Sequence, residues 1–274
     1  MRIEGHGISV KKILLAAGGL IVLAVIWSFI WGPLFAWGPM WGYERQNWEK
    51  VVSVAKDSSS FSGISNLDQV ITGEEASHGL EYKHKVKIII TNSRGEWKRF
   101  VPWLSYSIGG GTMMTGNTIY INREKIDSRG YNLDGFFKHE LSHELLYQNS
   151  SLSKAYRMYK QNWVEEGVAT YFGGPYDYYA SKDEFLNAYR EAKLVPGSNP
   201  LLLYENLDKQ NGKLSYTTYR FFFEYLSGKF GEEKLRKFIR LYTDNPGNYE
   251  AEFKESFGVS ITEAIRSFDQ AIKS

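Results

Sequence analysis

The five-residue segment HELSH, from His139 to His143, constrains the fold of this chain more than any other feature. Helical residues i and i+4 lie on one face, so a helix here would bring both imidazoles to one ion. Glu140 would lie about 100° around that helix from His139, where its carboxylate can reach a water molecule on the ion without being a ligand. Because the 274 residues include five histidines, a chance match to this pattern is expected in below about 1% of such chains. The segment therefore predicts a metal-binding helix.

Two imidazoles need a further ligand, and the segment WVEEGVATYF, from Trp163 to Phe172, offers two adjacent acids. Glu166 follows His143 by 23 positions, which leaves enough chain for a loop and a returning helix. Only one of two consecutive helical residues can face the ion, so Glu165 is the other candidate. Zinc is the natural ion for two imidazoles and a carboxylate with one open coordination position. We therefore expect a zinc site at His139 and His143 with one of these two acids.

HELSH together with WVEEGVATYF resembles the gluzincin branch of the zinc metallopeptidases. The similarity is to the peptidase MA-like domain and to the catalytic domain of the aminopeptidase-N-like enzymes. In that family the pattern H-E-x-x-H is followed by W-x-x-E-G-x-A, and the Glu before the Gly is the third zinc ligand. The resemblance therefore implies Glu166 as that ligand. It also implies an α+β, zincin-like (thermolysin-like) domain, with a small mixed sheet lobe and a helical C-terminal lobe.

The resemblance covers residues 118–274 and includes a helix from Tyr216 to Leu226, where the family has a tyrosine that stabilises the oxyanion. Tyr216 matches that position, and Tyr219 is the second candidate. The implied reaction is hydrolysis of a peptide bond in a peptide or protein substrate. Zinc would activate a water molecule, Glu140 would take its proton as general base, and Tyr216 would share the oxyanion charge.

The sequence departs from the family in two places. The segment Gly111–Thr115 has no acid where the family has G-A-M-E-N, whose Glu binds the free amine of a substrate. Aminopeptidase activity is therefore not implied. Thr170 stands four positions after Glu166, where some gluzincins have an acid behind the zinc ligands, so the group that orients His139 or His143 must come from elsewhere.

Residues 13–31 are strongly apolar, and no charged residue occurs from Ile13 to Tyr43. Nineteen helical residues at about 1.5 Å per residue give roughly 28 Å, which is close to the thickness of the hydrocarbon core. The alternative is a cleaved signal peptide, which is disfavoured because no Ala-x-Ala-like site follows the segment. We therefore expect residues 1–43 to comprise a cytoplasmic stub, a transmembrane anchor in contact with the lipid bilayer and a Trp-rich juxtamembrane segment.

Positive charges precede the apolar segment, at Arg2, Lys11 and Lys12, whereas Glu44 stands beside Arg45 on its far side. The positive-inside rule then places the N-terminus in the cytoplasm. Residues 44–274 are expected to form the metallopeptidase domain outside the cytoplasm, in a single-pass protein of the cell membrane.

Composition excludes several other classes of function. The 33 Lys and Arg residues nearly balance 31 Asp and Glu residues, and no basic domain stands out, so no nucleic acid is expected as a partner. The absence of cysteine excludes disulfides, thiolate metal sites and a cysteine nucleophile. The rival to an enzyme is a non-catalytic, membrane-tethered binding or assembly protein that retains the fold. The carboxylate of Glu140 beside two imidazoles favours the enzyme.

Local patterns predict a mixed α/β first half and a helical second half. The first half is expected to have a short helix over Asn47–Lys56, strands over Lys85–Thr91 and Thr118–Asn122, and a flexible loop at Gly109–Gly111. The second half is expected to be helical from a cap at Asp134, with capping boxes at Ser181–Glu184 and Ser260–Glu263. Three polar residues are interpreted as structural: His78 and His84 are expected on the surface, and Glu144 is expected to pair with a cation.

Overall fold

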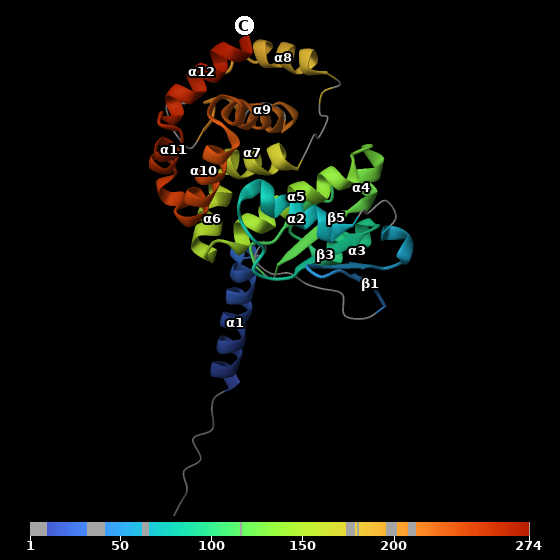
Figure 1. Ribbon diagram of the computed structural model, residues 1–274. Coiled ribbons are helices and arrows are strands. Elements are labelled where there is room, and N and C mark those ends of the chain that lie inside the picture. Colours follow the sequence, from blue (N-terminus) through green and yellow to red (C-terminus); the bar gives the residue numbers. More distant parts are fainter. Residues whose placement is uncertain are drawn as a thin grey trace, which may run out of the picture.

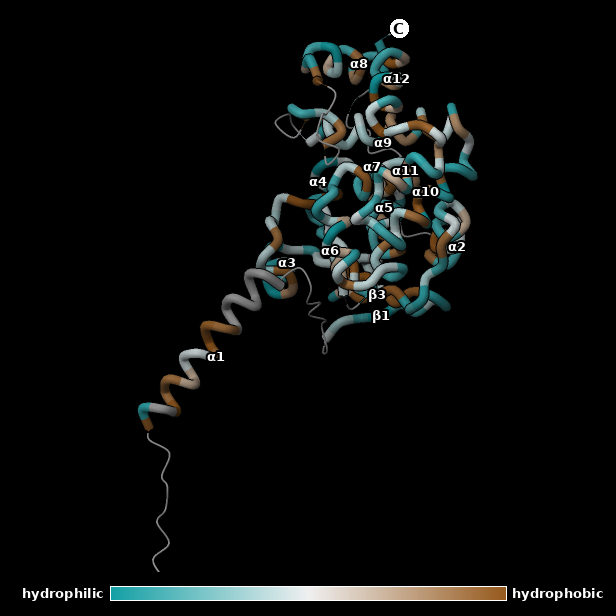
Figure 2. Tube along the Cα trace, turned by 90° about the vertical axis from the view of Figure 1, so that its left-hand side faces the viewer, coloured by the Kyte–Doolittle hydropathy of each residue, from teal (hydrophilic) through white to brown (hydrophobic). Residues whose placement is uncertain are grey.

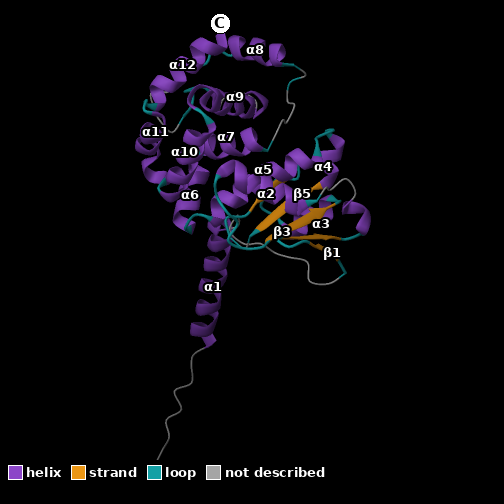
Figure 3. Cartoon of the chain, viewed as in Figure 1, coloured by secondary structure: helices purple, strands orange, loops and turns teal. Residues whose placement is uncertain are grey.

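A computed structural model of the chain describes residues 10–31, 42–61, 66–115, 117–173, 179, 181–195, 202–207 and 212–273. A sheet covered by helices forms one side of the body, and a group of helices forms the other (Figures 1 and 3). The first elements are α1 (Val10–Trp31), β1 (Glu44–Asn47), β2 (Val51–Ala55), η2 (Ser58–Phe61), α2 (Leu67–His78), β3 (Val86–Thr91), α3 (Arg94–Phe100), β4 (Gly110–Thr112), β5 (Thr118–Asn122) and α4 (Arg123–Ser128). The later elements are α5 (Leu133–Gln148), α6 (Leu152–Lys160), α7 (Asn162–Phe172), α8 (Lys182–Glu191), α9 (Gly212–Phe230), α10 (Glu232–Asp244), η4 (Pro246–Asn248), α11 (Tyr249–Phe257) and α12 (Ile261–Lys273). The expected mixed α+β class is confirmed.

The sheet has five strands in the order β1-β2-β3-β5-β4. The three central strands β2, β3 and β5 run parallel, and β1 and β4 pair antiparallel at the two edges. Ile88 and Ile90 of β3 face the core beneath α2 and α5, whereas Ile89 faces the core beneath α3, because successive side chains point to opposite faces of a strand. Helices therefore cover both faces, as parallel strands require.

The helices from α6 to α12 share a second core, which is rich in aromatic side chains. α7 lies along α9, and Gly167 allows the close approach, because a Cβ there would collide with the ring of Phe223. α5 connects the two halves of the molecule, since it packs on the sheet side against α2 and on the helical side against α7. Eleven of its 16 residues are buried.

Two local predictions are wrong. The segment Asn47–Lys56, expected to be a helix, is the end of β1 followed by β2. Val51, Val52 and Val54 of β2 pair in parallel with β3, and this pairing offers burial that a lone short helix would not. The expected loop at Gly109–Gly111 includes most of β4. A Cβ at Gly110 would lie 2.5 Å from the ring of Phe136 and 2.8 Å from the carbonyl oxygen of Tyr120, so glycine here permits packing of a strand and does not loosen a loop.

Other local predictions are confirmed. Both predicted strands occur as β3 and β5. Ser181 is the N-cap of α8, and Ser260 and Glu263 bond reciprocally at the start of α12, as a capping box requires. The expected cap at Asp134 is wrong by two residues, because α5 already begins at Leu133. Asn132 is its N-cap, accepting bonds from the amides of Asp134 at 2.9 Å and Gly135 at 3.4 Å, and Asp134 lies in the first turn.

α1 covers the segment expected to span a membrane, and Figures 1 and 2 show it projecting away from the body of the molecule. The span expected over residues 13–31 is not recovered: across the part of the chain that the structure describes, no helix combines the length and the hydropathy needed to cross a membrane. The stub before residue 10 and residues 32–41 of the expected Trp-rich segment lie outside the described residues.

Candidate metal centre

Three side chains from two helices converge at the interface between α5 and α7. His139 and His143 lie one turn apart on α5, and their Nε2 atoms are 3.1 Å apart. The Glu166 Oε2 atom, which comes from α7, lies 3.3 Å from Nε2 of His139 and 3.5 Å from Nε2 of His143. Zinc at about 2.0–2.1 Å from each of three tetrahedral ligands would separate those ligands by about 3.3 Å. The three atoms thus have the spacing of a zinc site, and they are the one group of this kind among the described residues.

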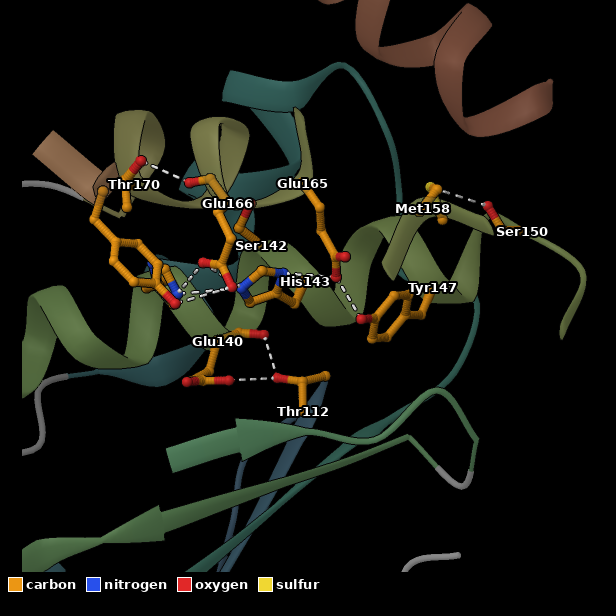
Figure 4. A network of polar contacts seen from close by, with 12 residues as sticks. Thr112, Glu140, Ser142, His143, Tyr147, Ser150, Met158, Glu165, Glu166 and Thr170 are labelled. Atoms are coloured by element: carbon orange, nitrogen blue, oxygen red, sulfur yellow. Dashed lines mark hydrogen bonds and ion pairs between the residues drawn. The ribbon is translucent and has the colours of Figure 1, made fainter. Parts of the chain in front are cut away.

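A second acid fixes the orientation of His143. Glu165 Oε1 lies 3.0 Å from Nδ1 of His143 and also accepts a hydrogen bond from the Tyr147 hydroxyl (Figure 4). A carboxylate can only accept, so Nδ1 carries the proton and Nε2 keeps its lone pair for an ion. Glu165 therefore lies behind the ligand, and Glu166 lies beside the two imidazoles.

The buried charges of this cluster are strongly coupled. Although burial opposes the shift, the carboxylates of Glu166 and Glu165 raise the pKa of His143 well above its usual range. Burial alone would raise the pKa of Glu166, but the nearby imidazoles of His143 and His139 hold that pKa well below its usual range. Ligand atoms that stabilise positive charge at their centre in this way provide the electrostatic environment that a divalent cation needs.

Glu140 points away from the three ligand atoms, toward the sheet. The hydroxyl of Thr112 in β4 lies 2.8 Å from Oε2 of Glu140 and 2.9 Å from its backbone oxygen (Figure 4). Burial raises the pKa of Glu140, and the two imidazoles together with the Thr112 hydrogen bond partly offset that rise. A carboxyl group with a raised pKa is suited to exchanging protons near neutral pH.

Tyr216 and Tyr219 of α9 occupy different environments. The Tyr216 hydroxyl donates to Glu166 Oε1 at 3.3 Å, and its ring lies 6.4 Å from the ring of His139. Tyr219 is buried in the helical core. Of the two candidates, Tyr216 is the one whose hydroxyl lies beside the metal centre.

A cavity of about 390 Å³ opens beside the cluster. Residues of β4, of α5 and of α9 line it, so the ligand atoms, Glu140 and Tyr216 can all be reached from one space. Apolar side chains, including Leu104, Ile108 and Phe136, make up much of the remaining wall. The arrangement places two imidazoles, three carboxylates and the Tyr216 phenol around one cleft, which suits a metal-assisted hydrolysis.

A second polar cluster lies between α5 and α2, and it corrects the expectation for His78. That residue is fully buried, with Nε2 at 2.7 Å from Ser142 Oγ, Nδ1 at 2.8 Å from the Glu74 carbonyl oxygen and at 3.7 Å from the Glu74 carboxylate. The order serine, histidine, glutamate matches that of a hydrolase triad, but Ser142 and His78 have no exposed surface and do not line the cavity. The cluster therefore ties α2 to α5 and is closed to substrate.

Glu144 also differs from its predicted role. It is buried and accepts a hydrogen bond from Gln148 at 2.9 Å, and it forms no ion pair with any described cation. Burial raises the pKa of Glu144 to about 8, so the group is neutral at pH 7. Neutrality replaces the expected cation as the way in which this acid is accommodated.

Three contacts at this site join partners that the sequence did not pair: Glu165 with His143, Tyr147 with Glu165, and Thr112 with Glu140. Thr170, which stands where some gluzincins have an acid, donates its hydroxyl to the backbone oxygen of Glu166 at 2.6 Å. A faint signal existed for Tyr147, because it follows His143 by four positions and so lies on the same face of α5.

No protein-family model matches the sequence, and no curated protein matches it. Solved structures do match the fold. One is a variant of a two-domain M1 zinc metallopeptidase bound to L-tryptophan, with a TM-score of 0.52 and 12% identity over 82% of this chain. Another is a variant of an M1 zinc metallopeptidase from Deinococcus radiodurans bound to a Tyr-Ser-Ala substrate, with a TM-score of 0.51 and 11% identity over 82% of this chain. This chain spans 51% of the length of each. The fold is thus similar to that of M1 zinc metallopeptidases.

Proposed function

We propose that this chain is a zinc-dependent metallopeptidase of the gluzincin type. The observation that carries the proposal is the convergence of His139, His143 and Glu166 beside Glu140 in one open cavity. The fold similarity and the tripeptide bound to one solved neighbour support a peptide as substrate. When bound, zinc would lower the pKa of a water molecule toward neutrality and polarise the carbonyl group of the scissile bond.

Glu140 is the general base of the proposed reaction. Its carboxylate would take a proton from the attacking water and later return it to the leaving amine. The hydrogen bond from Thr112 at 2.8 Å holds that carboxylate in one position, which reduces the freedom lost on reaching the transition state. Glu165 and Tyr147 keep His143 in the tautomer that leaves Nε2 available to the ion.

Tyr216 is the proposed oxyanion donor. Its hydroxyl lies at the metal centre, where it donates to Glu166, and it could turn to a developing oxyanion during the reaction. Tyr219 is excluded from that role by its burial in the core.

The edge strand β4 offers a place for an extended peptide. Bonds from Met113 to Thr118 and from Asn122 to Gly109 show that residues 109 and 113 face β5, so the backbone groups of Gly110 and Thr112 between them face away from the sheet. A substrate strand laid along this edge would pass over α5 and its two histidines. This geometry supports a substrate held by its backbone, as a peptidase requires.

A peptidase assay with the full-length chain tests the proposal. Cleavage of a quenched fluorescent peptide library should disappear on chelation and return with stoichiometric zinc. Glu140→Gln should retain zinc, measured by metal analysis of the purified protein, and lose cleavage. If Glu140→Gln cleaves peptides at the wild-type rate, Glu140 is not the general base. Zinc bound without cleavage of any peptide would favour a non-catalytic binding or assembly protein.

Membrane anchoring through residues 13–31 is a further part of the proposal, with the catalytic domain outside the cytoplasm. It is supported by the sequence and by the exposed apolar side chains of α1, of which Leu14, Leu15, Leu20 and Ile21 are 65–68% exposed. The full chain should stay with membranes after alkaline extraction, and protease added outside the cell should degrade residues 44–274. Release of the intact full chain into the alkaline supernatant would contradict the anchor.

A further inference from the structure

The acids and the cation in the cavity wall differ in whether they already have partners among the described residues. Three acids line it, and each is already engaged: Glu140 with Thr112, Glu165 with His143 and Tyr147, and Glu166 with both imidazoles. Among the described lining residues, none of the acids is therefore left to bind an ammonium group of a substrate. The lining includes one Lys or Arg side chain within the described ranges, which is Arg129.

Arg129 follows the end of α4 and is exposed to solvent in the cavity wall. Its guanidinium lies 5.8 Å from the ring centroid of Tyr131, a second lining residue. No acid in the described part of the chain forms an ion pair with it. The ring supports the cation without using its hydrogen-bond donors.

The two acids that most closely precede Arg129 already have other partners. Asp127 accepts two hydrogen bonds from Arg123, at 2.8 and 2.9 Å. Glu124 accepts from the Tyr106 hydroxyl and pairs with Lys125 at 3.5 Å. Neither of these α4 acids therefore neutralises Arg129, and its charge remains available to a ligand in the cavity.

The chemistry of the wall indicates what that ligand is. A guanidinium offers five donors in a planar fork whose geometry matches a carboxylate. The neighbouring wall is apolar, with Leu104, Ile108, Met113 and Phe136. A ligand that satisfies both features carries a carboxylate next to large apolar side chains.

We propose that Arg129 is a specificity-determining residue that binds a carboxylate of the peptide substrate, either an Asp or Glu side chain or a free C-terminus, beside apolar residues of the same peptide. The proposal rests on the proposed peptidase function, because it assumes that a peptide occupies this cavity. It predicts that the enzyme selects acidic peptides and does not select a free N-terminal amine.

Kinetics with matched substrates measure the selection. Fluorogenic peptides would differ only by Glu or Gln at successive positions around the scissile bond, and a second series would differ only by a free or an amidated C-terminus. In at least one pair, the peptide that carries the carboxylate should have a kcat/KM about tenfold higher than its partner. The difference should lie mainly in KM, because one charge-assisted contact is added. Which series shows the difference identifies the source of the carboxylate.

Three variants of the full chain locate that preference. Arg129→Gln should abolish it, Arg129→Lys should retain part of it, and Lys125→Gln, which removes a cation of α4 that does not line the cavity, should retain it fully. A preference that survives in Arg129→Gln, or the lack of any preference in a wild-type enzyme that cleaves peptides, would overturn the proposal.

Binding separates this proposal from hydrolysis itself. The same peptides, labelled with a fluorophore, would be titrated into the chelator-treated full chain and followed by fluorescence anisotropy. A carboxylate preference that is lost in Arg129→Gln would support the proposal even if no peptide is cleaved, in which case only the hydrolytic function would fail. Equal Kd values for both members of every pair, or no binding of either, would overturn the role of Arg129.

Discussion

The two polar clusters of α5, one shared with α7 and one shared with α2, both contain histidine and glutamate but have different properties. On the α7 side, two histidines and an acid place three ligand atoms at 3.1, 3.3 and 3.5 Å from one another, beside a cavity. On the α2 side, His78 meets a serine hydroxyl and a backbone carbonyl, and nothing in the cluster reaches the cavity. Both clusters are buried.

The difference lies in how the lone pairs are used. In the α2 cluster both ring nitrogens of His78 have hydrogen-bond partners, so the histidine is satisfied without an ion. In the α7 cluster Glu165 occupies only Nδ1 of His143, and Nε2 faces Nε2 of His139 and a carboxylate oxygen. Converging lone pairs and access to a cavity, and not residue type, distinguish a reactive site from a structural one.

The largest effect is expected from removing a ligand. His143→Ala should weaken zinc binding by more than about 100-fold, which exceeds the loss typical of residues behind the ligands. His78→Ala should leave zinc affinity unchanged and lower Tm, because it leaves Ser142 without its partner and opens a void. Competition with a fluorescent zinc chelator measures the first quantity and thermal unfolding the second. Equal zinc loss in both variants would erase the distinction between the clusters.

Tyr216→Phe should lower kcat roughly 100-fold, by analogy with the removal of one oxyanion donor, while zinc affinity stays the same. Tyr219→Phe is the matched control, because Tyr219 lies in the helical core away from the cluster. Steady-state kinetics on one fluorogenic peptide compare the two. If kcat is unchanged in Tyr216→Phe, the hydroxyl has no part in the reaction.

Glu165→Gln tests the support behind His143. The amide oxygen can still accept from Nδ1, but the negative charge is lost, so zinc affinity should fall by about 10-fold, at the low end of the range for such residues. Tyr147→Phe removes only the donor to Glu165 and should have a smaller effect. Isothermal titration of zinc into each variant ranks them. An unaltered affinity in Glu165→Gln would show that its charge does not support the ligand.

The smallest effect concerns the α2 cluster and depends on pH. Burial, partly offset by Lys138, raises the pKa of Glu74 from 4.5 to about 8. Between these values the unfolded chain releases a proton that the folded chain keeps, so this group lowers stability progressively as pH rises from 4.5 to 8.

Glu74→Gln removes that pH-dependent cost, so its stabilising effect should be larger at pH 7 than at pH 5. Urea unfolding of variant and wild type at several pH values gives the difference directly, and the titration of His78 is common to both proteins. A stability difference that does not change between pH 5 and 8 would show that Glu74 is not held in its neutral form.

Short-range patterns in the sequence were sufficient for much of this protein. The i, i+4 spacing of His139 and His143 placed both on one helix face, and capping boxes marked the starts of α8 and α12. The β-branched runs marked β3 and β5. Each depends on neighbours within one or two turns or strands, so the chain carries the information locally.

Tertiary structure alone decided which groups meet across long stretches of chain. It buried His78 against Ser142, which is 64 positions away in the sequence, and it set Glu165 behind His143, which is 22 positions away. It drew Val51–Ala55 into the sheet through pairing with β3, and it placed Arg129 in the wall of the cavity. Burial and partner choice depend on packing between distant segments, and one segment's composition does not contain that information.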